Sequence, residues 1–211
     1  MRPSKLIFLP GAAGRSDYWD TVAAALQHPA RRCSLGWPGF ADVPARDDVQ
    51  GFDDLVRLVQ AEIDQPCALI AQSMGGAVAL SAVLQRAPAA RAQVTHLVLA
   101  VTSGGVDLSG VGAQDWRAAF LAERPRVPRW FTDLRLDVSA QLPELRQACL
   151  LIWGDSDPIS PVAVGERLQA GLAQARLVVL PGAGHDLVLT HATDVARLID
   201  EHLSFSPHEL P

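Results

Sequence analysis

Two short stretches of this chain are apolar at every position, and they constrain the fold more than any other feature. Residues 68–71 read Ala-Leu-Ile-Ala, and residues 150–153 read Leu-Leu-Ile-Trp. A strand with one face in water alternates apolar and polar side chains, whereas a strand covered by helices on both faces is apolar throughout. The two runs therefore predict central strands of a buried parallel sheet.

Further apolar runs complete the set of expected strands, and helical segments separate them. The expected strands are residues 5–9, 31–35, 67–71, 95–101, 149–153 and 176–180. Apolar side chains at helical spacing fall between or after them, at Phe52, Leu55, Val56, Val59 and Ile63, and again at Val195, Leu198 and Ile199. The pair Ser160-Pro161 predicts another helix start, with the serine as N-cap and the proline in the first turn.

This alternation of strands and helices predicts an α/β fold: a doubly wound, mostly parallel sheet of about six strands, with ligands bound at their carboxyl ends. Residues 106–148 interrupt the pattern and contain no convincing strand. We expect residues 1–105 and 149–204 to form the core, residues 106–148 to form a reduced cap over the carboxyl edge, and residues 205–211 to form a frayed tail.

Composition excludes several classes of protein. The chain has 211 residues, enough for one domain, and a formal net charge of -5, which argues against a nucleic-acid binder. No apolar run approaches the roughly 20 residues that a membrane helix needs. Three cysteines, Cys33, Cys67 and Cys149, fall in apolar runs without metal-type spacing, and indicate small buried side chains in a reducing compartment. We expect a cytoplasmic protein with no membrane partner, no metal and no cofactor.

A serine stands where one central strand turns into a helix. The segment reads Leu-Ile-Ala-Gln-Ser-Met-Gly-Gly over residues 69–76, which places Ser73 at the turn. A serine in such a turn has a strained backbone and an exposed hydroxyl, and the turn requires small residues on both sides. Gly75 meets this requirement on one side, and Ala71 replaces the more usual glycine on the other. We interpret Ser73 as a nucleophile; the competing interpretation is a serine that only caps the helix.

A serine nucleophile needs a base, and the base needs an orienting carboxylate. Among six histidines, His185 follows a strand through a glycine-bearing loop, and His191 is a weaker second candidate. Asp157 follows the fifth strand and is favoured as the carboxylate, with Asp155 as its alternative. Serine, aspartate and histidine thus follow three different strands in the order typical of α/β-hydrolases.

The tetrahedral intermediate of acyl transfer also needs hydrogen-bond donors for its oxyanion. The backbone amide of Met74, just after the serine, is one candidate. The turn after the first strand reads Pro-Gly-Ala-Ala-Gly, and Ala12 is the favoured second donor, with Ala13 as the alternative.

These motifs together resemble the α/β-hydrolase superfamily over nearly the whole chain. Ala-Gln-Ser-Met-Gly-Gly, Gly-Asp-Ser-Asp-Pro and Gly-Ala-Gly-His resemble its nucleophile, acid and base motifs, and Trp-Pro-Gly-Phe resembles its turn after the second strand seen here. The resemblance implies strand order 2-1-3-4-5-6. Pro10 departs from the family's usual histidine, and Ala71 from its glycine. In motif and size the chain is similar to compact serine esterases that cleave pimeloyl-acyl-carrier-protein methyl ester.

The expected cap is rich in aromatic and arginine side chains. Trp116 and Phe120, four residues apart, would share one helix face over the site, with Trp130 and Phe131 as the opposite wall of a substrate pocket. Five arginines (Arg117, Arg124, Arg126, Arg129 and Arg135) stand against three acids (Asp115, Glu123 and Asp133), a net charge of +2. This charge suits an anionic substrate or an acidic acyl carrier protein, and the favoured simpler interpretation is a solvated surface.

The sequence therefore predicts a serine hydrolase, of carboxylesterase type, that cleaves an ester or thioester of a small-molecule acid through an acyl-enzyme on Ser73. Three alternatives stay open. One is an esterase specific for an ester on an acyl carrier protein. Another is a lyase that uses the same three residues for proton transfer, and the last is a ligand receptor without catalysis.

Overall fold

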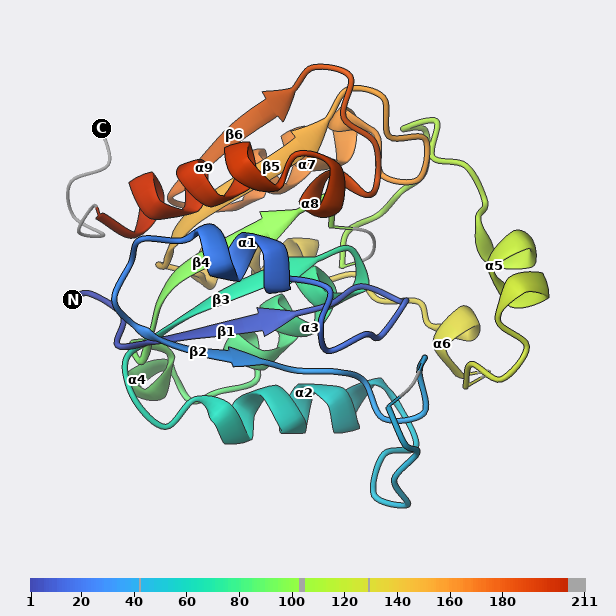
Figure 1. The fold of residues 1–211 in the computed structure, drawn as a ribbon, viewed down its shortest axis with the longest axis horizontal. Coiled ribbons are helices and arrows are strands. Elements are labelled where there is room, and N and C mark those ends of the chain that lie inside the picture. Colours follow the sequence, from blue (N-terminus) through green and yellow to red (C-terminus); the bar gives the residue numbers. More distant parts are fainter. Residues whose placement is uncertain (42, 103–104, 129, 205–211) are drawn as a thin grey trace.

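The computed structural model describes residues 1–41, 43–102, 105–128 and 130–204, and its centre is a six-stranded, all-parallel sheet. The strand order is β2-β1-β3-β4-β5-β6 (Figure 1). The strands are β1 (Lys5–Leu9), β2 (Arg31–Ser34), β3 (Cys67–Gln72), β4 (Val94–Ala100), β5 (Ala148–Gly154) and β6 (Ala175–Leu180). The predicted fold class and strand order are confirmed, and each predicted strand lies within one residue of the observed one at either end.

Burial explains why the central strands are apolar at every position. Every residue of β1, β3, β4 and β5 is buried, whereas β2 and β6 at the two edges keep part of their surface exposed. One row across the sheet aligns Ile7, Leu69, Leu97 and Cys149 on neighbouring strands. With this register the carboxyl ends of the strands meet at one edge, where the loops that carry Ser73, Asp157 and His185 begin.

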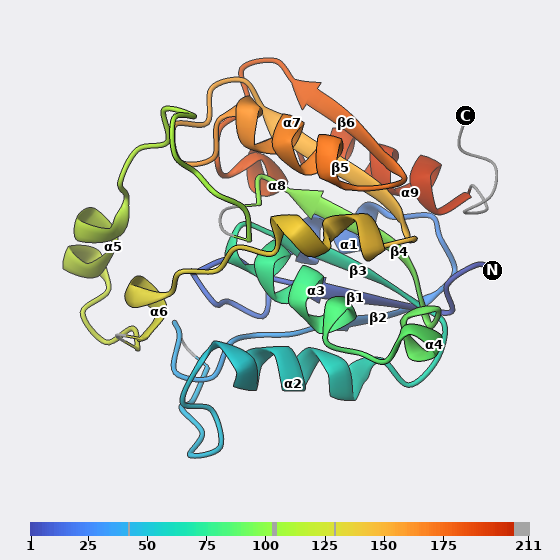
Figure 2. The same cartoon turned by 180° about the vertical axis from the view of Figure 1, so that it is seen from behind.

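Helices cover both faces of the sheet, as a doubly wound fold requires. The longer ones are α1 (Asp20–Ala25), α2 (Phe52–Glu62), α3 (Met74–Leu84), α7 (Val162–Gly171) and α9 (Ala192–Ser204), and the short ones here are α4 (Pro88–Arg91) and α8 (Leu187–Thr190). Helices α1 and α9 lie over one face (Figure 1), and α3 and α7 lie over the other, with α2 beside α3 (Figure 2). None of the helices in the described ranges has the length and apolar character to cross a bilayer.

Two details differ from the sequence prediction. Helix α7 begins at Val162, and Ser160 is not its N-cap: the Ser160 hydroxyl instead donates a hydrogen bond to the carbonyl of Thr102 at 2.7 Å. Cys67 and Cys149 are buried as expected, and burial raises the pKa of both thiols to about 12. Cys33 is only partly buried, because it lies on the edge strand β2, with its sulfur 3.5 Å from a carboxylate oxygen of Glu62.

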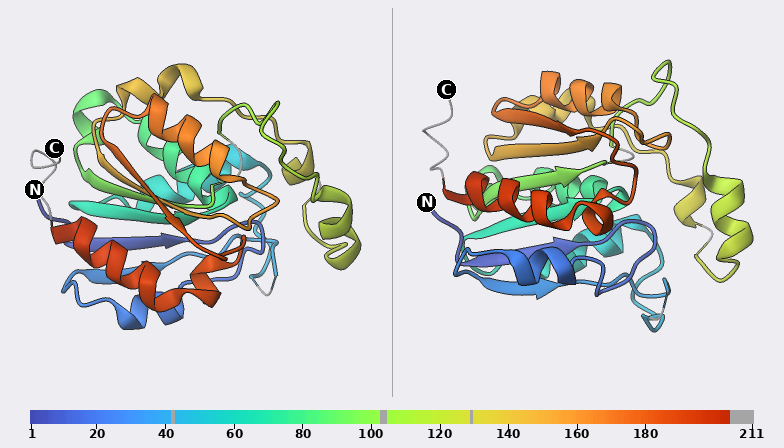
Figure 3. Two further views of the ribbon diagram at one scale, coloured as in Figure 1. Left: turned by 90° about the horizontal axis from the view of Figure 1, so that it is seen from above. Right: turned by 45° about the horizontal axis from the view of Figure 1, so that its top comes forward.

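The segment between β4 and β5 leaves the body of the sheet and returns. It contains α5 (Arg117–Glu123), α6 (Trp130–Asp133) and the 3₁₀ helix η1 (Ser139–Glu144). Helices α5 and α6 project beyond the carboxyl ends of the strands, whereas η1 lies back beside α7 (Figure 3). The backbone N–H of Val138 donates to the carbonyl of Gly105 at 2.9 Å, which joins the end of the projecting part to its beginning. The expected tail at residues 205–211 lies outside the described residues.

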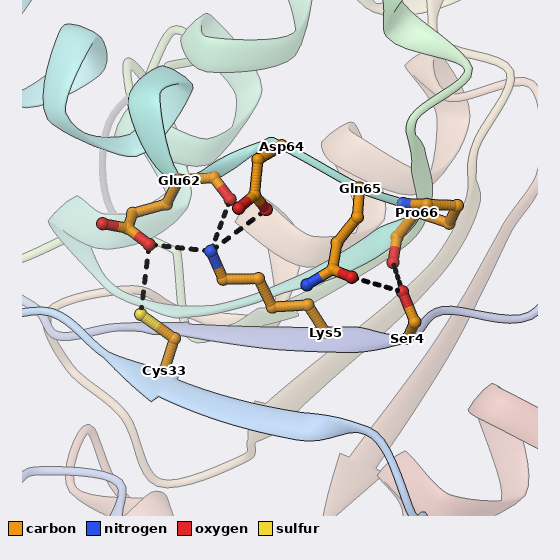
Figure 4. Close-up of polar contacts among 7 residues, drawn as sticks. All are labelled: Ser4, Lys5, Cys33, Glu62, Asp64, Gln65 and Pro66. Atoms are coloured by element: carbon orange, nitrogen blue, oxygen red, sulfur yellow. Dashed lines mark hydrogen bonds and ion pairs between the residues drawn. The ribbon is translucent and has the colours of Figure 1, made fainter.

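A buried lysine holds the opposite, amino-terminal edge of the sheet together (Figure 4). The ammonium of Lys5 donates to the carbonyl and the carboxylate of Glu62, both at 2.8 Å, and to Asp64 at 3.3 Å. The hydrogen bond from Lys5 lowers the pKa of Glu62, so the carboxylate stays charged beside its partner. This cluster joins β1 to the end of α2 and lies at the far end of the sheet from Ser73.

Candidate active site

Ser73 lies in the sharp turn between β3 and α3 and has a strained backbone. Its φ of 52° and ψ of -123° lie in a region that residues other than glycine rarely adopt. The turn brings the start of α3 close against the end of β1. A Cβ added to Gly75 would lie 2.5 Å from the carbonyl oxygen of Pro10 and 2.8 Å from that of Leu9, too close for any side chain. The glycine that follows the serine is therefore required by close backbone packing. Ala71, the departure from the usual pattern, is fully buried and stays in register with Leu9 of β1.

His185 follows β6 and points its ring at the serine. Its Nε2 lies 2.9 Å from the Ser73 Oγ, and its side chain is 22% exposed. The side chain of Gln72 donates a hydrogen bond to the backbone carbonyl of His185 at 3.1 Å, which ties the histidine loop to the end of β3. The alternative histidine, His191, instead has its ring nitrogen 3.0 Å from the hydroxyl of Thr190.

Asp157 completes the hydrogen-bonded series. Its Oδ2 lies 2.7 Å from the Nδ1 of His185, and its side chain is fully buried. Its other oxygen accepts the backbone N–H groups of Ile159 at 2.8 Å and Ser160 at 3.1 Å. The alternative, Asp155, points elsewhere and accepts the N–H of Gly182 at 2.7 Å. The structure thus brings Ser73, His185 and Asp157 together, and gives Asp155 a place in holding the loop before His185.

In the part of the chain that the structure describes, Ser73 lines two cavities, and we name them by size. The large groove, about 530 Å³, is lined by Ser73, His185 and Gln72, by Trp116 and Phe120 from the projecting segment, and by Ala12 and Ala13. The small pocket, about 60 Å³, is lined by Ser73, Ala12, Met74, Ala77, Trp116 and Phe131, among others. The two expected oxyanion donors, Ala12 and Met74, thus line the same pocket beside Ser73, whereas the alternative Ala13 lines the large groove.

The four aromatic residues proposed as substrate-binding form one cluster with Phe40. Phe131 is buried, with its ring centroid 5.3 Å from Trp116 and 5.7 Å from Phe120, so it packs directly on these rings, and it lines the small pocket together with Trp116. Trp130 packs on Phe40 at 5.9 Å and is absent from the lining of both cavities. Phe40 comes from the loop after β2, so the cluster connects α5 and α6 to the core.

Two of the cap arginines, Arg117 and Arg124, have local acidic partners. Arg124 pairs with Glu123 at 2.8 Å and lies over the ring of Phe120, and Arg117 pairs with Asp115 at 3.3 Å and lies over Trp116. Arg129 lies outside the described residues. Charged residues on the large groove are Asp115, Glu123, Asp186 and Arg124, so its described lining is net acidic.

Sequence reasoning did not single out two residues of the site. Tyr18, in the loop between β1 and α1, lines the large groove. Burial, together with the nearby carboxylates of Asp186 and Asp157, raises the pKa of its phenol. Gln72 positions the histidine loop. The sequence offered one signal for Gln72, because it is a polar residue at the end of an otherwise apolar strand. It offered none for Tyr18, because the path of its loop is seen only in the structure.

Among the described residues, no three or more His, Cys, Asp or Glu side chains gather in a way that could hold a metal ion.

A hydrogen-bonded Ser, His and Asp at the carboxyl edge of a parallel sheet in this strand order is the arrangement of α/β-hydrolase-fold enzymes. Comparison with known proteins agrees with this class. Residues 6–198 match the alpha/beta hydrolase family, and the chain belongs to it.

The individual relatives share between 21% and 30% of their aligned residues with this chain. The chain is 30% identical over 233 residues to the polyketide synthase ThaQ of Burkholderia thailandensis, an alignment that covers 90% of this chain but spans only 11% of ThaQ. It is 25% identical to the pimeloyl-[acyl-carrier protein] methyl ester esterase of Nitrosomonas europaea, over 85% of this chain and 88% of that protein. A thermophilic esterase from Thermogutta terrifontis has a similar fold, with a TM-score of 0.75, 21% identity, and 96% of this chain and 90% of that chain covered. Family and fold support a hydrolase.

Proposed function

We propose that this protein is a serine hydrolase of carboxylesterase type, which cleaves an ester or thioester through an acyl-enzyme on Ser73. The observation that carries the proposal is the unbroken series of hydrogen bonds from Ser73 Oγ to His185 Nε2 at 2.9 Å, and from His185 Nδ1 to Asp157 at 2.7 Å. These distances suit proton transfer from the hydroxyl to the imidazole during attack.

Each residue has a defined part in the proposed reaction. The Ser73 oxygen attacks the carbonyl carbon, and its proton passes to His185 Nε2. Asp157 keeps the Nδ1 proton in place and stabilises the imidazolium that forms. The N–H groups of Ala12 and Met74 receive the oxyanion, a contribution of about 3–4 kcal/mol per donor where it has been measured. His185 then protonates the leaving group, and water releases the acid by the same steps.

Hydrolysis of p-nitrophenyl acetate, followed by the absorbance of the released nitrophenol, tests the proposal. We expect an initial burst of p-nitrophenol that matches the enzyme concentration if deacylation is slow, and an acetyl adduct on the peptide that contains Ser73. Ser73→Ala should lower kcat by several orders of magnitude while the circular dichroism spectrum is retained. Ser204→Ala, a serine exposed at the end of α9, serves as the matched control and should keep wild-type activity.

The same measurement separates the alternatives. A lyase that uses these residues only for proton transfer would form no acyl adduct, and a ligand receptor would show neither adduct nor turnover. Substantial esterase activity in Ser73→Ala would contradict the proposal outright.

An ester on an acyl carrier protein is the second candidate substrate. Similarity to the Nitrosomonas europaea esterase and the arginines of the cap favour it. The local pairing of Arg117 and Arg124, and the acidic lining of the large groove, favour a small neutral ester instead. If a carrier is recognised by charge, kcat/KM for a carrier-bound ester should fall as salt rises, and should fall further in Arg124→Ala with Arg126→Ala.

A further inference from the structure

The two cavities at Ser73 differ almost tenfold in size and share one wall. The large groove of about 530 Å³ lies within the range of small-molecule sites, about 300–1,000 Å³, and the small pocket of about 60 Å³ lies far below it. Ser73, Ala12 and Trp116 line both cavities. A substrate whose carbonyl carbon is at Ser73 therefore has a roomy side and a narrow side, and Trp116 lines both.

The position of His185 shows which half of an ester belongs on which side. Acylation forms a bond from Ser73 Oγ to the carbonyl carbon and breaks the bond from that carbon to the leaving oxygen. The serine proton moves to His185 Nε2 and then to the leaving oxygen, which departs as an alcohol. The leaving oxygen must therefore be near His185, which lines the large groove and is absent from the lining of the small pocket.

The acyl half then extends toward the other side. There, Met74 and Ala77 at the start of α3 and Phe131 from α6 surround a space that holds only a few heavy atoms. We propose that the enzyme is selective for esters of short carboxylic acids with large alcohols, and that Trp116 is the residue that limits the acyl chain. This proposal rests on the serine-hydrolase function proposed above and specifies its substrate class.

Trp116 is held firmly enough to act as a wall. Its ring centroid lies 5.4 Å from Phe120 in an edge-on arrangement and 5.3 Å from Phe131. The guanidinium of Arg117 lies 5.4 Å from the ring centroid. Two residues earlier, the N–H of Gln114 donates to the carbonyl of Pro158 at 2.8 Å, beside Asp157. A third cavity of about 550 Å³ shares Trp116, Leu134 and Leu136 with the small pocket, and its remaining lining is partly apolar and partly charged. Loss of the indole would therefore open additional space beside the small pocket.

Hexyl acetate and methyl heptanoate provide the sharpest test, because they are isomers that place the long chain on opposite sides of the ester. We expect kcat/KM for hexyl acetate to exceed that for methyl heptanoate by at least about tenfold, after correction for their rates of alkaline hydrolysis. Trp116→Ala should raise kcat/KM for methyl heptanoate and reduce the ratio at least about fivefold. Leu189→Ala, an exposed residue of α8 that lines neither cavity, is the control and should keep the wild-type ratio.

The outcomes distinguish this proposal from the one on which it rests. Wild-type enzyme that hydrolyses methyl heptanoate as fast as hexyl acetate, or a ratio that Trp116→Ala leaves unchanged, would overturn the substrate assignment and leave the serine hydrolase intact. Failure of Ser73→Ala to abolish hydrolysis of either ester would overturn the serine mechanism itself. If Trp116→Ala does not fold, Trp116→Leu tests the same wall with less lost volume, and an unchanged ratio in that variant would overturn the substrate assignment in the same way.

Discussion

Asp157 and Asp155 lie in the same loop, yet their carboxylates have different partners. Asp157 contacts His185 with one oxygen and two backbone N–H groups with the other. Asp155 accepts one backbone N–H, from Gly182, and the hydroxyl of Ser156. This difference gives different expectations for the same chemical change at the two positions.

Asp157→Asn should lower kcat by about 10⁴-fold with little change in stability. The amide oxygen of the new side chain would replace Oδ1, which accepts the N–H groups of Ile159 and Ser160, so its NH₂ would face His185. Two donors cannot share that hydrogen bond. Nδ1 would lose its proton, and Nε2 would carry one and could no longer accept the proton of Ser73. Steady-state kinetics on p-nitrophenyl acetate measures the loss.

Asp155→Asn is the matched control. An asparagine oxygen can still accept the N–H of Gly182, so kcat should stay within a few-fold of wild type. A larger loss in Asp155→Asn than in Asp157→Asn would show that the orienting carboxylate has been assigned to the wrong residue.

At the scale of elements, the approach of α3 to β1 decides the geometry of the nucleophile turn. Gly75 lies where the first turn of α3 meets the backbone carbonyls of Leu9 and Pro10. Ala71, on the other side of the serine, is buried in β3 and already carries the methyl group that the usual glycine lacks. The two small residues around Ser73 are therefore under different constraints.

Gly75→Ala should destabilise the protein by about 1–3 kcal/mol and lower kcat, because the new methyl group would push α3 away from β1 and move Ser73 relative to His185. Ala71→Gly should retain activity and cost about 1 kcal/mol, through lost burial and greater flexibility of the unfolded chain. Urea unfolding combined with ester hydrolysis measures both effects. Equal loss of activity in the two variants would contradict this account of the turn.

At the scale of the whole molecule, a buried histidine makes stability depend on pH. His202 of α9 lies edge-on to His96 of β4 at 5.1 Å and hydrogen-bonds the carbonyl of Ala148 at 3.2 Å. Burial, with a further contribution from His96, lowers the pKa of His202 to about 3. The folded protein therefore holds this side chain neutral over a pH range in which the unfolded chain binds a proton.

The free energy of unfolding should fall as the pH drops below about 6.5, because between that value and the folded pKa the unfolded state binds more protons. From pH 6 to pH 4 the contribution of His202 is about 2 kcal/mol. His202→Gln, which keeps a donor for Ala148, should flatten this part of the profile by a similar amount. Urea unfolding at several pH values provides the test, and parallel profiles for the two proteins would contradict it.

Much of the fold was predictable because it depends on local pattern. Continuous apolar runs identified the central strands, and the residues that follow them gave Ser73, Asp157 and His185 as candidates. The arrangement of the cap was not predictable in the same way. Trp130 and Phe131 are adjacent in sequence, but their positions depend on packing against Phe40, which lies in a loop much earlier in the chain. Ser160 had an N-cap pattern, yet a carbonyl from the loop after β4 provides its hydrogen bond instead.

Labelling with a fluorophosphonate tests the central claim, a nucleophilic Ser73, most directly. The reagent phosphonylates only a serine whose hydroxyl is activated, so intact-protein mass spectrometry followed by peptide mapping reports both stoichiometry and position. We predict one adduct per chain on Ser73, no adduct in Ser73→Ala, and much slower labelling in His185→Ala, with Ser204→Ala labelled as fast as wild type. Labelling of another residue, or equal labelling of Ser73→Ala and wild type, would contradict the account.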